Sequence, residues 1–217
     1  MTSVAIVVFG ADSLELPVPT LAALNSRVCE SGCVRLRQER AFAYTLLERA
    51  YADFFEKKLP AISFSPDGKP YLVESKIKVS VSHSDGICAV SFSDLDNGID
   101  VQGYDSMLGK ERAVERFVNK DVQKMIKNAK KPDLRLSVYR ANERGELETV
   151  DEGEVVLCAR PSAVGVDAAM LWPSAEALLK CRNGFRDIAM LSQLAAASRV
   201  YTFYTHGAAV SVAELIG

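Results

Sequence analysis

The sequence predicts a mixed fold in which helices and strands occupy separate stretches of the chain. Polar and apolar residues alternate strictly at 77–82, which predicts a strand, and two strand-like runs follow closely behind it. Apolar residues recur three or four positions apart in two charged segments, 28–58 and 110–130, which predicts amphipathic helices. The sequence of residues 200–213 also weakly resembles that of residues 79–92. This similarity suggests that the chain has two similar halves, which we expect at 1–103 and 104–217.

Composition excludes several classes of protein. The chain has 217 residues, and a hydrophobic content of 48% can fill a sizeable core. Lysine and arginine together number 26 against 28 aspartates and glutamates, so the net charge of -2 offers no general attraction for nucleic acid or for a membrane surface. The apolar run Val4–Phe9 is too short to span a membrane and predicts a buried first strand instead.

Cysteine usage indicates a reducing compartment. The five cysteines form no CxxC pair, and their odd number favours free thiols in a cytoplasmic protein over a disulfide framework. Cys29 and Cys33 lie four positions apart and could share a metal. Because no histidine or second cysteine pair lies nearby, we favour small helix-packing residues.

The helix expected at 28–58 ends before Pro60 and carries arginines, including Arg40, on its polar face. The sequence Ser-Pro-Asp-Gly at 65–68 follows and predicts a tight turn, after which Lys69 should be exposed.

Three strands should come next, at 77–82, 87–92 and 99–102, and form an antiparallel meander. In the first of them, Val79 and Val81 should face a core and Ser80 and Ser82 the opposite side. His83 and Ser84 close that strand, and Asp96–Gly98 provides the turn into the third.

The second half of the chain is more varied. The helix at 110–130 should cover a sheet with one face only, and 135–139 and 155–158 resemble strands separated by a polar, acidic loop. Trp172-Pro-Ser should open a further helix, which Asn183-Gly184 should stop. Residues 200–213 predict a terminal hairpin, with His206 in a structural or surface role.

Candidate chemical groups fall on two of these elements. Strand alternation places Asp100 and Gln102 on one face of their strand. Helical periodicity places Glu176 and Lys180, which are four residues apart, on one face of their helix. Two carboxylates could hold magnesium, and the lysine could contact a phosphate bound to it. The alternatives are a solvated strand aspartate and an ordinary surface ion pair on the helix. His83, flanked by serines, could contact a phosphate or ribose, or could be a hydrogen-bonded histidine at a strand end.

Four ordered motifs resemble the 4'-phosphopantetheinyl transferases. They are GKP at 68–70, SVSHS at 80–84, GIDVQ at 98–102 and W-x-x-x-E-A-x-x-K at 172–180. The arginine-bearing helix around Arg40 and ERF at 115–117 extend the resemblance over about 35–185. It implies the α+β fold of that family, with two halves related by pseudo-twofold symmetry, in the two-lobed type that modifies carrier proteins.

The resemblance also implies an activity and its residues. The enzyme would move phosphopantetheine from coenzyme A to a serine of an apo acyl or peptidyl carrier protein and release 3',5'-ADP, with Mg²⁺ as cofactor. Asp100, Glu176 and Gln102 would face the metal, Glu176 would accept the serine proton, and Lys180 would stabilise developing charge. The residues implied to contact coenzyme A are Arg40, Lys69, Pro70, Ser82, His83 and Lys180, with Arg40 and Lys69 near the adenosine 3'-phosphate.

Two positions depart from the family pattern. Gln102 stands where a glutamate is common, and Ala175 stands where a lysine commonly precedes the helix glutamate. The alternative is therefore a catalytically weakened homologue that binds coenzyme A or a carrier protein without efficient transfer. We expect a monomer, since two lobes in one chain can form the site.

Overall fold

The computed structural model describes residues 1–10, 15–150, 166–182 and 190–216, and has the α+β character expected from the sequence. The strands are β1 Thr2–Val8, β2 Ile62–Phe64, β3 Pro70–Leu72, β4 Lys78–Ser84, β5 Ile87–Ser93, β6 Asn97–Gly103, β7 Leu134–Ala141, β8 Leu147–Thr149, β9 Ser198–Thr205 and β10 Ala208–Leu215. The helices are α1 Ala22–Cys29, α2 Val34–Phe55, α3 Tyr104–Met107, α4 Glu111–Phe117, α5 Lys120–Asn128, α6 Val166–Cys181 and α7 Leu191–Ala196.

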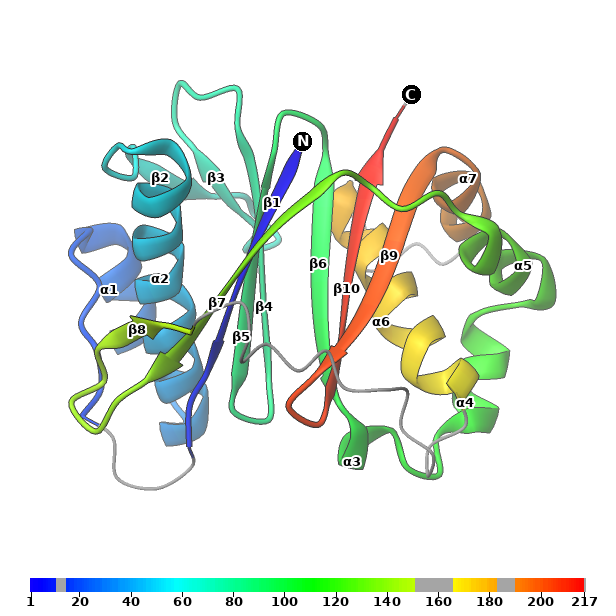
Figure 1. Ribbon diagram of the computed structural model, residues 1–217, viewed down its shortest axis with the longest axis horizontal. Coiled ribbons are helices and arrows are strands. Elements are labelled where there is room, and N and C mark those ends of the chain that lie inside the picture. The colour runs from blue at the N-terminus through cyan, green and yellow to red at the C-terminus, as the bar shows by residue number, and fades with distance from the viewer. Residues whose placement is uncertain (11–14, 151–165, 183–189, 217) are drawn as a thin grey trace.

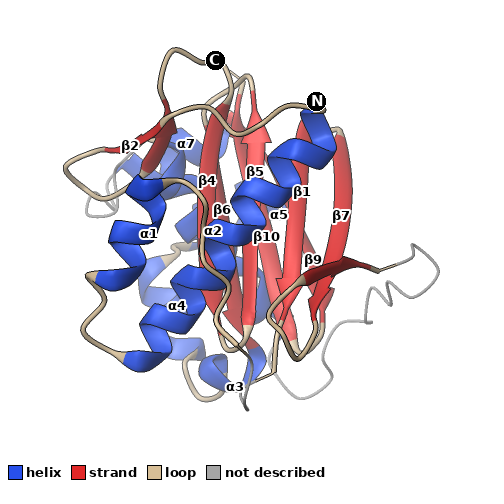
Figure 2. Ribbon diagram, turned by 90° about the vertical axis from the view of Figure 1, so that its left-hand side faces the viewer, coloured by secondary structure: helices blue, strands red, loops and turns tan. Residues whose placement is uncertain are grey.

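Two sheets lie face to face between helices (Figure 1). Within the described residues, the first sheet has the strand order β4-β5-β1-β7-β8 and the second has the order β6-β10-β9. Helices α1 and α2 lie outside the first sheet, and α6 lies outside the second with α4, α5 and α7 around it. Figure 2, seen from the side of α1 and α2, shows α2 crossing the strands of the first sheet.

The predicted first strand is confirmed as β1 and occupies the middle of the first sheet. It pairs antiparallel with β5 and parallel with β7. Ala5 and Val7 face the core beneath α2, whereas Val4 and Ile6 face the core between the two sheets. A strand with apolar residues on both faces is typical of such an inner layer.

The helix predicted at 28–58 is confirmed as α2, but its predicted start is wrong, because residues 28 and 29 end a separate helix, α1. Helix α1 ends at Cys29 and α2 begins at Val34, with Cys33 in an extended conformation before it. Ser31 is buried in the junction, where its carbonyl oxygen accepts from Arg37. Cys29 and Cys33 thus lie at the ends of separate helices and are exposed, so their expected packing role is also wrong.

The antiparallel meander is correct for β4 and β5 and wrong for β6. Strand β6 leaves the first sheet and pairs antiparallel with β10 of the second. The side of β4 that carries Ser80 and Ser82 faces β6 and is buried, opposite the side that carries Val79. Ser80 Oγ accepts a hydrogen bond from the N–H of Ile99, and Ser82 Oγ accepts one from the N–H of Val101. Side-chain hydroxyls thus satisfy two β6 donors that a meander would have paired with backbone carbonyls.

The segment predicted as one helix at 110–130 is also divided, into α4 and α5. Asn119 caps α5 by accepting from the N–H of Val122, which ends the preceding helix and starts a new one. The apolar periodicity is confirmed, because Val114, Val118, Val122 and Ile126 are all buried. These side chains pack towards α6 and α7, so α6 is the helix that covers the sheet and the expected sheet-covering role is wrong.

Helix α6 begins at Val166, so the prediction that Trp172-Pro-Ser opens the helix is wrong and Pro173 lies inside it. Buried neighbours such as Ala169 and Leu171 hold this turn in the core despite the missing N–H of proline. The expected cap at 183–184 and the expected strand at 155–158 lie outside the described residues. The strand at 135–139 is confirmed as part of β7.

The similarity between the two hairpin sequences has a structural counterpart. The β4–β5 turn places Asp85 and Gly86 at φ 50° and 80°, and the β9–β10 turn places His206 and Gly207 at 45° and 77°. Positive φ at both central residues is the condition for a type I′ hairpin turn. The expected boundary at 103 does not separate the sheets, because β6 joins the second sheet while β7 joins the first. None of the described helices is both long enough and apolar enough to span a bilayer.

Candidate active site

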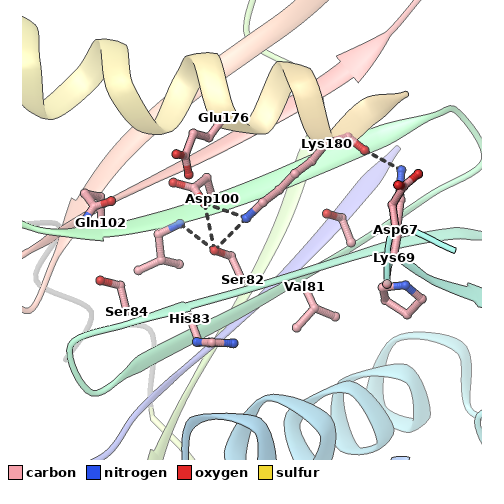
Figure 3. A pocket seen from close by; sticks show the side chains of 14 residues that line it. Asp67, Lys69, Val81, Ser82, His83, Ser84, Asp100, Gln102, Glu176 and Lys180 are labelled. Atoms are coloured by element: carbon pink, nitrogen blue, oxygen red, sulfur yellow. Dashed lines mark hydrogen bonds and ion pairs between the residues drawn. The ribbon is translucent and has the colours of Figure 1, made fainter. Parts of the chain in front are cut away.

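A cavity of about 340 Å³ opens where β4, β6, α6 and the β2–β3 turn meet. Figure 3 shows Glu176 and Lys180 reaching down from α6, Asp100 and Gln102 projecting from β6, and Ser82 pointing towards them from β4. The face-sharing predicted for each pair is therefore confirmed, and the structure brings the two pairs together at one cavity. Most of the side chains that line the cavity are polar or charged, and they include both carboxylates and lysines.

Close packing of α6 on β6 makes this meeting possible, and it depends on Gly98. A Cβ atom at position 98 would lie 2.0 Å from the carbonyl oxygen of Ala177 and 2.8 Å from Cβ of Lys180. Glycine lacks that atom, so the helix can approach the strand at this point. The helix then delivers Lys180 to Asp100.

Asp100 is buried, with 3% of its surface exposed. Its Oδ1 atom accepts from Lys180 Nζ at 2.6 Å and from Ser82 Oγ at 2.9 Å. Its Oδ2 atom is also buried, yet receives no hydrogen bond from the described residues. Because a buried carboxylate oxygen without a partner is costly, Oδ2 is a ready ligand for a cation.

Glu176 faces Asp100 across the cavity. Burial is the main factor that raises the pKa of Glu176 to about 7, and the charge of Asp100 raises it further. The Lys180 ammonium and a hydrogen bond with Trp172 act in the opposite direction. Two carboxylates in one desolvated site favour either a shared proton or a bound cation, because either one reduces their mutual repulsion.

Lys180 is 9% exposed, and its Nζ contacts both Asp100 Oδ1 and Ser82 Oγ, the latter at 3.0 Å. Its charge therefore already balances part of the negative charge of the site. Ser82, Asp100 and Lys180 form one hydrogen-bonded group drawn from β4, β6 and α6. Sequence reasoning found all three residues but not their mutual contacts.

Lys69 was expected to be exposed, and that prediction is wrong. The β2–β3 turn folds against the end of α6, where Lys69 Nζ donates to the carbonyl oxygens of Lys180 at 2.6 Å, Cys181 at 3.2 Å and Asn97 at 3.3 Å. Burial lowers the pKa of Lys69. A cation at the last carbonyls of a helix interacts favourably with the helix dipole, so Lys69 acts here as a cap on α6.

The remaining predicted contacts divide between the cavity and its surroundings. Pro70 and Gln102 line the cavity, and the Gln102 amide nitrogen donates to Ser106 Oγ. His83 borders the cavity but points to the opposite side of β4 from Ser82, and its Nδ1 lies 2.9 Å from Glu39 Oε2. Arg40 does not line the cavity, because its guanidinium bonds the Arg27 carbonyl and Ser31 Oγ.

Sequence reasoning missed Glu39, which is buried on α2 next to His83. Burial raises the pKa of Glu39, but His83 and Arg35 outweigh it and hold the pKa below its ordinary value. Arg35 continues the chain of charges to Asp85 at 2.6 Å. The helical spacing of Arg35 and Glu39 could have suggested the first pair, but no local signal pointed to His83.

Ala175 has no exposed surface and belongs to the core cluster around α6. Ala175 does not line the cavity, so the absence of a lysine at this position does not remove a charge from the cavity wall. Within the described part of the chain, no cluster of three or more histidine, cysteine or acidic residues is suited to holding a metal. A cation would therefore depend on Asp100 and Glu176, with Gln102 and non-protein ligands.

No protein-family model and no curated protein sequence matches this chain. The functional assignment consequently depends on the geometry of the cavity and on the four sequence motifs that converge there.

Proposed function

We propose that the chain is a magnesium-dependent 4'-phosphopantetheinyl transferase of the two-lobed type. It would transfer phosphopantetheine from coenzyme A to a serine of an apo acyl or peptidyl carrier protein. The observation that carries the proposal is the pairing of Asp100 with Glu176 beside Lys180 in one polar cavity. Two of the four motifs supply these three residues, and residues of the other two, 80–84 and 68–70, line the same cavity. The two type I′ hairpins are what a fold of two related halves would contain.

The residues fit a hard dication. Asp100 offers a buried Oδ2 atom without a partner, and Glu176 is a carboxyl whose raised pKa a cation would lower again. Gln102 would add an amide oxygen if its side chain turned from Ser106. Magnesium, when bound, supplies positive charge to the phosphate oxygens of the substrate.

The reaction would form a bond between the carrier serine oxygen and the β-phosphorus of coenzyme A, and would break the bond from that phosphorus to the oxygen that leaves with 3',5'-ADP. Glu176 lies beside Asp100 and Lys180 in the cavity and would accept the serine proton. Lys180 would offset charge on the phosphate while Ser82 and Asp100 hold its ammonium in position. Lys69 would act through α6 and not on the phosphate.

The same cavity supports one competing function, a coenzyme A-binding homologue with weak transfer. Gln102 supplies no negative charge, and its amide is engaged by Ser106. We place either protein in the cytoplasm, which suits the four free thiols among the described cysteines, and as a monomer.

Incubation of the pure protein with coenzyme A, Mg²⁺ and a panel of apo carrier proteins tests the proposal. Mass spectrometry should show a phosphopantetheine mass gain on at least one carrier. Asp100→Ala should reduce that transfer by more than ~100-fold with its circular dichroism spectrum unchanged, because a metal-binding carboxylate should matter more than residues that only support it. Binding of coenzyme A without mass gain on any carrier would favour the competing function.

A further inference from the structure

His83 lines the cavity from the side of β4 that is turned towards α2. Among the described strands, β4 lies at the edge of the first sheet, so the cavity runs along an open strand edge. Residues from both faces of β4 line it, with Ser80 and Ser82 on one face and Val81 and His83 on the other. Figure 3 shows Val81 and His83 on the α2 side of the strand. The imidazole therefore lies between the cavity and α2.

Glu39 is the α2 residue that meets this imidazole. It is 8% exposed, and its Oε2 atom lies 2.9 Å from Nδ1 of His83. Its Oε1 atom accepts from Nε of Arg35 at 3.1 Å, and Arg35 is held in turn by Asp85 at 2.6 Å. Each carboxylate oxygen of Glu39 thus has its own partner, and these two contacts hold the carboxylate in one orientation.

The charge of Glu39 decides which nitrogen of His83 carries a hydrogen. Burial raises the pKa of Glu39, but hydrogen bonds and charges from His83 and Arg35 bring the pKa below its ordinary value. Glu39 is consequently an ionised carboxylate at neutral pH, and a carboxylate can only accept hydrogen bonds. Nδ1 of His83 must then carry a hydrogen, which leaves Nε2 as the nitrogen that can gain or lose one.

Nε2 is the nitrogen that a ligand can reach. Nδ1 is buried, whereas 27% of the His83 side chain is exposed. No residue that the structure describes bonds Nε2. By contrast, Lys69, Arg40 and Lys180, which were also predicted to contact coenzyme A, each bond protein groups. His83 therefore offers the cavity a nitrogen that no described protein group has taken.

We propose that Glu39 is a positioning residue for coenzyme A, holding His83 so that its Nε2 atom faces a phosphate group in the cavity. The inference rests on the proposed function and adds a residue to its coenzyme A site. An ionised phosphate oxygen can only accept, so Nε2 takes up a proton from solvent when the phosphate binds. The imidazolium then donates from Nδ1 to Glu39 and from Nε2 to the phosphate. Glu39 favours this charged form, because its carboxylate offsets the imidazolium charge.

Nitrogen NMR on protein labelled with ¹⁵N-histidine tests the tautomer without an assay of activity. The chain has two histidines, so His206→Gln assigns both sets of signals. At about pH 9, where imidazole is normally neutral, His83 should show a protonated Nδ1 and an unprotonated Nε2. Saturating coenzyme A at neutral pH should protonate both nitrogens. Glu39→Met should abolish the preference for a protonated Nδ1.

Substitutions of Glu39 test its part in binding. Glu39→Met should lower the calorimetric affinity for coenzyme A by about tenfold and raise its KM, with kcat near wild type. A tenfold loss is the lower end of what removal of a carboxylate that orients a metal-binding histidine costs. Glu39→Gln keeps an acceptor for Nδ1 without the charge, so its effect should be smaller. In a His83→Gln background, Glu39→Met should add little, because Glu39 then has no imidazole to hold.

The matched control is Glu48→Met, the same substitution on the same helix. Glu48 accepts hydrogen bonds from Thr20 and from the N–H of Leu21, and it does not line the cavity. Its loss should lower Tm while coenzyme A affinity and the His83 tautomer stay those of wild type. The control thus separates a loss of stability from a loss of binding.

An unprotonated Nδ1 in the wild type would overturn the inference. So would equal coenzyme A affinity in Glu39→Met and Glu48→Met, or an undiminished effect of Glu39→Met in the His83→Gln background. If thermal melting shows that Glu39→Met is unfolded, Glu39→Gln replaces it, and wild-type affinity in that variant rejects the role. A wild type that binds coenzyme A but modifies no carrier defeats the proposed transferase, and the tautomer and affinity comparisons still decide the role of Glu39. A wild type that binds no coenzyme A rejects both.

Discussion

Substitution of Gly98 by alanine tests the contact that brings α6 to β6. The added Cβ atom would lie 2.0 Å from the Ala177 carbonyl oxygen, whereas real Cβ contacts essentially never fall below 3.0 Å. The helix must therefore move away from the strand by about 1 Å. Since the obstructing atom belongs to the backbone of α6, no side-chain rotation can relieve the clash.

The cost follows from this displacement. Overpacking of a well-packed interface destabilises proteins by ~1–3 kcal/mol, and the lower backbone entropy of unfolded alanine offsets roughly 0.4–1 kcal/mol. We expect Gly98→Ala to lower the free energy of unfolding by about 1–2 kcal/mol. For a chain of this size, that corresponds to a decrease in Tm of about 2–8 °C.

The same movement should disturb chemistry, because Lys180 Nζ and Asp100 Oδ1 are in contact at 2.6 Å. A misplacement of about 1 Å in a catalytic arrangement can reduce the rate by roughly 100-fold. Carrier modification should therefore decrease by about that factor, while the far-ultraviolet circular dichroism spectrum stays that of a folded protein.

The matched control is Gly32→Ala, since a Cβ atom at position 32 meets nothing within 4 Å. Its thermal denaturation should resemble that of wild type. If Gly98→Ala melted at the same temperature as Gly32→Ala, the close approach of α6 to β6 would be refuted, and with it this explanation of the Lys180–Asp100 contact.

Three further predictions concern the residues around the cavity. The pKa of Glu176 is raised from 4.5 to about 7, so between these pH values the folded protein keeps a proton that the unfolded chain releases. The contribution of Glu176 to stability should therefore fall as the pH rises through this range and stay constant above it. Tm measured against pH should show this trend, and Glu176→Gln should remove it. Mg²⁺ should raise Tm more at pH 8 than at pH 5. A Tm profile that is identical in wild type and Glu176→Gln would contradict the raised pKa of Glu176. Lys69→Met should lower the free energy of unfolding by ~1–3 kcal/mol, because three carbonyls lose a charged donor. It should also reduce kcat more than coenzyme A affinity. If calorimetry showed a loss of coenzyme A affinity alone, Lys69 would be a phosphate-binding residue instead. Gln102→Glu should lower the magnesium concentration needed for half-maximal rate with little effect on coenzyme A, and an unchanged magnesium dependence would mean that residue 102 does not face the metal.

Local periodicity in the sequence determined which residues share a face. Alternation in the strand placed Asp100 with Gln102, and the helical period placed Glu176 with Lys180; both pairs line the cavity. The positions of the β4–β5 and β9–β10 hairpins were likewise readable, because short-range turn preferences decide them. The turn predicted at 96–98 is wrong, because Asn97 and Gly98 belong to β6 and pair with β10. These features depend on neighbouring residues and on backbone geometry that varies little between proteins.

Only the tertiary structure decided what each face meets. The sequence did not reveal that β6 would pair with β10, because strand pairing depends on a segment far along the chain. For the same reason, Lys69 was assigned to solvent but caps α6, and Arg40 was assigned to the ligand but bonds the α1–α2 junction. A long flexible cation has several possible partners of similar energy, and the packing of distant elements determines which of them lies within its reach.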